Sequence, residues 1–153
     1  MNKTTVFFLR TGKPNPMDNR NVLCQKGMDQ ATRAGNQLRA FRIDVILCSP
    51  LPYAYQTAKE VERLHLAHSP RIETVPELIC AADFSEEAVA ENLKKVMGYI
   101  LEKFKRKSVL MVSHAMVGQA FLAHHIEESF EITKVHWPTI EHGAMVCREF
   151  IED

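Results

Sequence analysis

The chain has 153 residues, of which 46% are hydrophobic and 25% charged, a balance typical of a soluble globular protein and not of a disordered or fibrous one. Nineteen basic residues offset nineteen acidic ones, so no broad electrostatic field favours nucleic acid or an anionic membrane as partner. We therefore expect one domain over residues 1–153, in which any recognition of an anion is local.

The cysteines are widely spaced, form no Cys-x-x-Cys pair, and lie in or beside apolar segments, where thiols act as small hydrophobic groups. They are Cys24, Cys48, Cys80 and Cys147. This usage favours a reducing compartment. The apolar run before Arg10 is too short for a signal-peptide core or a membrane span. We expect a cytoplasmic protein.

The first predicted strand is the apolar run Val6–Leu9, which places Arg10 and Thr11 at its end, before a turn at Gly12. Ligands of open α/β sheets bind beyond the carboxyl ends of the strands, so a guanidinium at this place is well positioned to hold an oxyanion. The next residues, 13–21, are rich in proline and asparagine and predict a loop over this strand end. Lys13 and Arg20 are the loop residues most able to reach an anion.

The next segments alternate between helical and extended patterns. Apolar spacing predicts an amphipathic helix over Lys26–Phe41, and a buried strand follows over Asp44–Cys48, ending at Ser49. A second helix is expected over Pro52–Leu64, with proline in its tolerated first turn. A third β segment is predicted over Arg71–Val75.

The second half repeats this alternation. Ser85 is a suitable N-cap for a helix whose continuous apolar face extends over Val89–Phe104. A buried strand, Val109–Val112, then leads to His114 and a helix over Val117–His124. His114 is thus a second chemically capable residue at a strand-to-helix corner.

The last expected elements are a loop around Trp137-Pro138 and a strand over Ala144–Phe150, whose alternation predicts a sheet edge. Strands alternating with helices predict an α/β three-layer sandwich with a largely parallel central sheet. Four polar residues should then converge on one end of that sheet: Arg10, Thr11, Ser49 and His114.

Four segments of the chain are similar, in sequence and in order, to the motifs of a known family: Phe7–Gly12, Leu23–Ala31, Ser49–Ala58 and Val109–His114. This order resembles the histidine phosphatase superfamily, also called phosphoglycerate mutase-like, and the chain length is similar to that of its short phosphohistidine-phosphatase branch. The resemblance spans most of the chain and implies the superfamily's fold. By resemblance, Arg10 would bind phosphate bidentately, and His114 would donate to a phosphoryl oxygen from the start of a helix.

The resemblance also exposes departures from the superfamily pattern. The first motif of the superfamily is Arg-His-Gly, in which the histidine attacks phosphorus, and Thr11 stands at that place. The third block carries a phosphate-clamping arginine where this chain has Tyr53, and Lys13 is a candidate to restore part of that charge. The superfamily's general acid, often a carboxylate, would fall near Cys80.

These departures favour a pseudophosphatase, because a threonine hydroxyl is a poor nucleophile without a neighbouring base. Such a protein would bind a phosphorylated small molecule, a phosphoprotein or another anion, or a protein partner. Two alternatives stay open. One is an active phosphatase in which Thr11 or water attacks and His114 serves as base or acid. The other is an interaction or oligomerisation module with a vestigial pocket.

Structural roles compete with these functional ones. The Thr11 hydroxyl could bond to backbone, His114 could be a structural histidine, and Tyr53 could fill the volume of the arginine instead of stacking, with Tyr55, on a ligand ring. We expect no cofactor and no metal. Four histidines of the C-terminal part lack metal-ligand spacing: His124, His125, His136 and His142.

Overall fold

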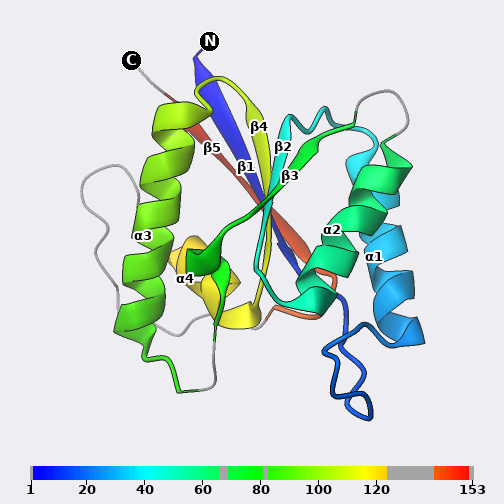
Figure 1. Ribbon diagram of the computed structural model, residues 1–153. Coiled ribbons are helices and arrows are strands. Elements are labelled where there is room, and N and C mark those ends of the chain that lie inside the picture. Colours follow the sequence, from blue (N-terminus) through cyan, green and yellow to red (C-terminus); the bar gives the residue numbers. More distant parts are fainter. Residues whose placement is uncertain (1, 66–68, 81–82, 124–139, 152–153) are drawn as a thin grey trace.

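A computed structural model of the chain describes residues 2–65, 69–80, 83–123 and 140–151 (Figure 1). Within these residues, strands and helices alternate as the sequence predicts. The strands are β1 (Lys3–Arg10), β2 (Val45–Cys48), β3 (Arg71–Thr74), β4 (Ser108–Ser113) and β5 (Met145–Ile151). The helices are α1 (Gln25–Leu38), α2 (Pro52–Leu64), the short 3₁₀ turn η1 (Pro76–Leu78), α3 (Glu86–Lys103) and α4 (Ala115–Ala123).

The strands form one sheet in the order β3-β2-β4-β1-β5. The first four run parallel, and β5 pairs antiparallel with β1 at the sheet edge. Helices α1 and α2 cover one face, and α3 and α4 cover the other (Figure 1). The predicted three-layer α/β sandwich with a largely parallel sheet is therefore confirmed.

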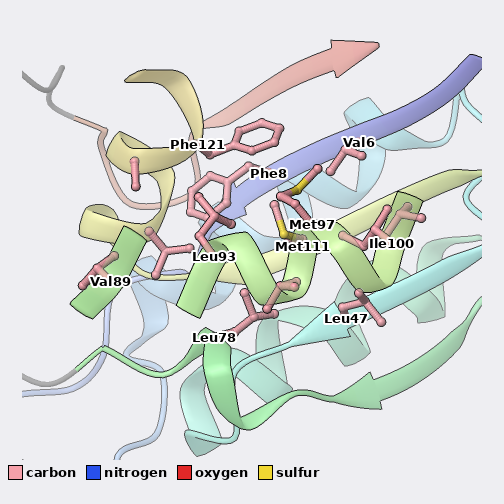
Figure 2. Packing of buried hydrophobic residues seen from close by; sticks show 14 of the residues in the cluster. Val6, Phe8, Leu47, Leu78, Val89, Leu93, Met97, Ile100, Met111 and Phe121 are labelled. Atoms are coloured by element: carbon pink, nitrogen blue, oxygen red, sulfur yellow. The ribbon is translucent and has the colours of Figure 1, made fainter. Parts of the chain in front are cut away.

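Both faces of the central strands are buried, which explains why β1 and β4 are unbroken apolar runs in the sequence. Val6 and Phe8 point into the core beneath α3 and α4, and Figure 2 shows them among residues such as Leu93 of α3. Phe7 and Leu9 point into the opposite core beneath α1 and α2. Alternate residues of one strand therefore stabilise opposite layers.

The long helix α3 begins where the sequence predicts. The Ser85 hydroxyl accepts a hydrogen bond from the Ala88 amide over 3.1 Å, which caps the helix. Leu93, Met97 and Ile100 are fully buried on its inner face, and Figure 2 shows them packed toward the sheet. The expected amphipathic helix is thus also the main cover of this face.

Two expectations need correction. The first helix ends at Leu38, not at Phe41, whose half-exposed ring instead packs against Phe7 with centroids 5.1 Å apart. An apolar residue at helical spacing can thus pack on the core from the loop beyond the helix.

Cys147 is exposed on the edge strand, not in an apolar setting. His124 and the Trp137-Pro138 loop lie outside the described residues.

No helix in the described part of the chain combines the length and apolarity that a membrane span requires.

Candidate functional site

The carboxyl ends of three neighbouring parallel strands place the predicted site residues together. Arg10 is the last residue of β1, while His114 and Ser49 directly follow β4 and β2. The ladder continues one step beyond the strands, because the Thr11 amide donates to the Ser113 carbonyl over 2.9 Å. A cavity of about 400 Å³ opens at this edge. It is lined by Arg10, Thr11, Pro14, Tyr53, Cys80, His114, Ala115, Met116 and His142.

Arg10 is held in place through two of its nitrogens. Nη1 donates to the Ile140 carbonyl over 2.5 Å, and Nη2 donates to His142 Nε2 over 3.1 Å. The guanidinium forms no other hydrogen bond to a described residue, so its remaining N–H groups can serve a ligand. Burial lowers the pKa of Arg10, against an opposing effect of the nearby Glu141 carboxylate. An arginine keeps its charge at neutral pH despite such a shift.

His142 was missed as a site residue by sequence reasoning. Because its Nε2 accepts from Arg10, its proton lies on Nδ1, which donates to the Thr11 carbonyl over 3.2 Å. Burial and the Arg10 charge lower the pKa of His142, in agreement with a neutral ring. Because β5 pairs antiparallel with β1, the residues just before β5, such as His142, lie next to the end of β1. The strand predicted over Ala144–Phe150 was the sequence feature that could have indicated this position for His142.

His114 has both ring nitrogens near protein hydroxyls. Nε2 lies 2.8 Å from Ser49 Oγ, and Nδ1 lies 3.4 Å from Tyr53 Oη. Burial, together with the Arg10 charge, lowers the pKa of His114 to about 4. The imidazole is therefore neutral at neutral pH and acts as a hydrogen-bonding group, not as a second cation.

Helix α4 begins directly after His114, whose carbonyl accepts from the Gly118 amide over 3.1 Å. The amides of Ala115 and Met116 thus belong to the first turn, where helices lack internal acceptors for their N–H groups. Both residues line the cavity. This helix end favours an anion near Arg10 and His114.

Thr11 is buried and lines the cavity, and its hydroxyl forms no hydrogen bond to any described residue. The backbone bond considered as a structural role for this hydroxyl is thus not present among these residues. The Thr11 carbonyl, in contrast, accepts from His142 Nδ1 and, over 3.3 Å, from the Gly143 amide. The His142 imidazole is therefore directed at the backbone of Thr11.

Tyr53, in the first turn of α2, lines the cavity. Its ring meets the His114 ring edge-on, with centroids 5.6 Å apart. Burial and the nearby Cys80 raise the pKa of Tyr53, so the phenol stays neutral. The Cys80 thiol lies 3.8 Å from the Met116 sulfur, and burial raises the pKa of this thiol as well. Neither residue supplies a charge to the cavity.

The loop cations do not line the cavity. The Lys13 side chain is exposed. Its backbone lies close to Gly27, where an added Cβ would sit 2.1 Å from the Lys13 carbonyl oxygen. Lys13 acts on the site only through its charge, which contributes to the lowered pKa of His142. Arg20 pairs with Asp18 over 2.6 Å at the surface.

No group of three or more histidine, cysteine or acidic side chains within the described ranges is arranged to hold a metal ion.

Comparison with known proteins gives a family match and a fold match. Residues 17–79, which extend from the loop before α1 to just beyond η1, match the model of the histidine phosphatase superfamily (branch 1). No curated protein sequence matches the chain. The fold is similar to Bacillus stearothermophilus YhfR, with a TM-score of 0.75, 17% identity, and 94% and 90% of the two chains covered.

Two further neighbours carry phosphatase names. A mutant phosphoserine phosphatase from Entamoeba histolytica in complex with phosphoserine has a TM-score of 0.72 and 14% identity, over 94% of this chain and 89% of that one. A mycobacterial glucosyl-3-phosphoglycerate phosphatase in complex with VO3 has a TM-score of 0.71 and 14% identity, over 94% and 90%. Residues 17–79 thus resemble the histidine phosphatase superfamily, and the chain shares the fold of these solved structures.

One cavity brings together nearly all the residues that the sequence predicts for the site. They are Arg10, Thr11, Tyr53, Cys80 and His114. Ser49 contacts the site through His114, Lys13 stays outside the lining, and His142 is added. The arrangement can hold an oxyanion through one guanidinium, neutral imidazoles and a helix N-terminus.

Proposed function

We propose that this protein is a catalytically impaired member of its superfamily that binds a phosphorylated small molecule, a phosphoprotein or another anionic ligand around Arg10 and His114. The observation that carries the proposal is Thr11, a buried hydroxyl beside Arg10 at the place of the superfamily's attacking histidine.

The surroundings of Thr11 support loss of the phosphatase reaction. A threonine hydroxyl needs a neighbouring base to become a useful nucleophile. His142 bonds to the Thr11 carbonyl, and the Thr11 hydroxyl forms no hydrogen bond to an imidazole of the described residues. Removing a covalent nucleophile from a cooperating set of residues costs on the order of a million-fold in turnover. Turnover by the superfamily's mechanism should therefore be negligible.

Tyr53 supports weakened phosphate binding. The resemblance places an arginine at this position, and a hydrogen bond to a charged group contributes roughly 1.5–3 kcal/mol. The Tyr53 hydroxyl lies 3.4 Å from His114 Nδ1, so part of its hydrogen-bonding capacity is directed at the protein. One lost contact of this kind weakens binding by about 10- to 150-fold.

Retained anion binding has its own support. The Arg10 guanidinium is fixed by the Ile140 carbonyl and His142, neither of which neutralises its charge. The first turn of α4 also lines the cavity, and backbone amides at a helix N-terminus favour an anion. Among the structural neighbours, the mutant phosphoserine phosphatase was crystallised with phosphoserine, an example of this fold holding a phosphorylated ligand while altered.

A cytoplasmic location is part of the proposal. It is supported by Cys24, Cys48 and Cys147, which form no disulfide bonds.

Hydrolysis of p-nitrophenyl phosphate and of phosphohistidine by the purified protein tests the loss of activity. We expect no release of product above that of the Arg10→Ala variant. Turnover at rates normal for a phosphatase, abolished in Arg10→Ala, would reject the proposal in favour of an active enzyme. Titration with inorganic phosphate tests the binding half, with a heat signal expected from the wild type and none from Arg10→Ala.

A further inference from the structure

Most of the polar groups around the cavity are neutral. Arg10 contributes one positive charge. His142 accepts a hydrogen bond from Arg10 at Nε2, which a protonated ring could not do. His114 lies between the hydroxyls of Ser49 and Tyr53, and no carboxylate of the described residues bonds to its ring to favour the charged form. The lining described here therefore balances one negative charge.

The second negative charge of a dianionic ligand would also find few hydrogen-bond donors in the cavity. Two Arg10 nitrogens are already engaged, one with the Ile140 carbonyl and one with His142. Tyr53 supplies a single hydroxyl at the position where the superfamily resemblance places a guanidinium with several N–H groups. A dianion placed here would leave part of its charge without a cationic partner in a half-enclosed cavity, which is costly.

The rest of the lining is apolar or weakly polar. Met116, Cys80, Pro14 and the Tyr53 ring face the cavity, and the sulfur atoms of Met116 and Cys80 lie 3.8 Å apart. Thioether and thiol groups are polarisable and pack well against aromatic rings. A ligand that fills this cavity can bury an apolar or aromatic substituent next to its anionic group.

We propose that the cavity selects singly charged oxyanions with an apolar or aromatic substituent, such as sulfonates, sulfate esters, carboxylates and phosphodiesters, over doubly charged phosphomonoesters. This inference rests on the proposed anion-binding function of the same site and narrows it to a charge class. The selection follows from the single guanidinium at Arg10 and the neutral wall at Tyr53.

A calorimetric titration at pH 8 with benzenesulfonate and phenyl phosphate tests the proposal, because both ligands carry a phenyl group and a tetrahedral oxyanion but differ in charge. We expect benzenesulfonate to bind about tenfold more tightly. Equal or tighter binding of phenyl phosphate, lost in Arg10→Ala, would overturn the charge selection and leave the proposed function standing. If neither ligand bound, the proposed function would fail together with this inference.

The Tyr53→Arg variant gives a second measure of the same claim. It adds a guanidinium to the wall, so we expect phenyl phosphate to gain at least about tenfold over benzenesulfonate relative to the wild-type ratio. Lys94→Ala is the matched control, since it changes an exposed lysine on α3 and should leave the ratio unchanged. An unchanged ratio in a folded Tyr53→Arg would contradict the proposal. The wild-type ratio alone decides it if that variant does not fold.

Discussion

Arg10 and His142 form a linked pair at the end of β1. Arg10 Nη2 donates to His142 Nε2 over 3.1 Å, and the other ring nitrogen of His142 lies 3.2 Å from the Thr11 carbonyl, to which it donates. The guanidinium is thus oriented by a neutral acceptor and keeps its positive charge for a ligand. In the same arrangement the imidazole contacts the backbone of Thr11, so it is not placed to activate the Thr11 hydroxyl.

If the proposed function is correct, placing the residues that the superfamily resemblance implies at positions 11 and 53 should give phosphatase activity. In the double variant Thr11→His with Tyr53→Arg, an imidazole nucleophile and a second guanidinium would again flank Arg10. We expect hydrolysis of p-nitrophenyl phosphate to rise by at least about a thousandfold over wild type, a small part of the roughly million-fold contribution of a nucleophile. The assay is the initial rate of nitrophenolate release.

The matched control for this gain is the same double variant with Arg10→Ala, which should return to the wild-type rate. A folded double variant without any gain would mean that the cavity has lost the superfamily's geometry.

Stability should fall as the pH drops, because the pKa of His114 is lowered from its usual value to about 4. Below the unfolded-state pKa of about 6.5 the unfolded chain gains a proton that the folded chain does not, so acid favours unfolding. Between pH 7 and pH 5 this effect is about 2 kcal/mol. In urea titrations, the loss of stability between these pH values should be smaller by about this amount in His114→Gln than in the wild type. An identical pH dependence in both proteins would argue against a buried neutral His114.

Two glycine substitutions should have opposite effects on stability. In Gly27→Ala the new Cβ would lie 2.1 Å from the Lys13 carbonyl oxygen, so the backbone of the site loop would have to move. We expect a loss of about 1–3 kcal/mol. Gly98→Ala on α3 meets no atom within 4 Å and should stabilise by about 0.5–1 kcal/mol. Thermal unfolding compares the two, and equal shifts would contradict the close contact between Lys13 and the first turn of α1.

Leu93→Ala tests whether ligand binding depends on the packing of the core. Leu93 of α3 is buried in the same cluster as Phe8 (Figure 2) and does not line the cavity. Its truncation should reduce the free energy of unfolding by about 2–5 kcal/mol. Phosphate affinity, measured by calorimetry at a temperature where the variant is folded, should stay within about twofold of wild type. A large loss of affinity would indicate that the cavity depends on this core.

The sequence predicted the position of site residues best where an apolar strand pattern could be combined with the known geometry of parallel sheets. The apolar run before Arg10 and the strand before His114 predicted that these residues share a sheet edge, because parallel strands end on the same side. His142 was not predicted, since only the antiparallel pairing of β5 brings it to Arg10. Lys13 was expected to reach the anion site, but its side chain is exposed and does not line the cavity, and composition alone does not reveal the direction of a loop side chain. Phe41 was assigned to a helix because apolar spacing does not distinguish a helical residue from a loop residue that packs on the core.

Phosphorus NMR of phenyl phosphate mixed with the wild-type protein tests the central claim most directly, because one spectrum reports both binding and hydrolysis. We predict a broadened or shifted phenyl phosphate signal that is lost in Arg10→Ala, with no inorganic phosphate formed over a day. Steady formation of inorganic phosphate by the wild type but not by Arg10→Ala would contradict the account.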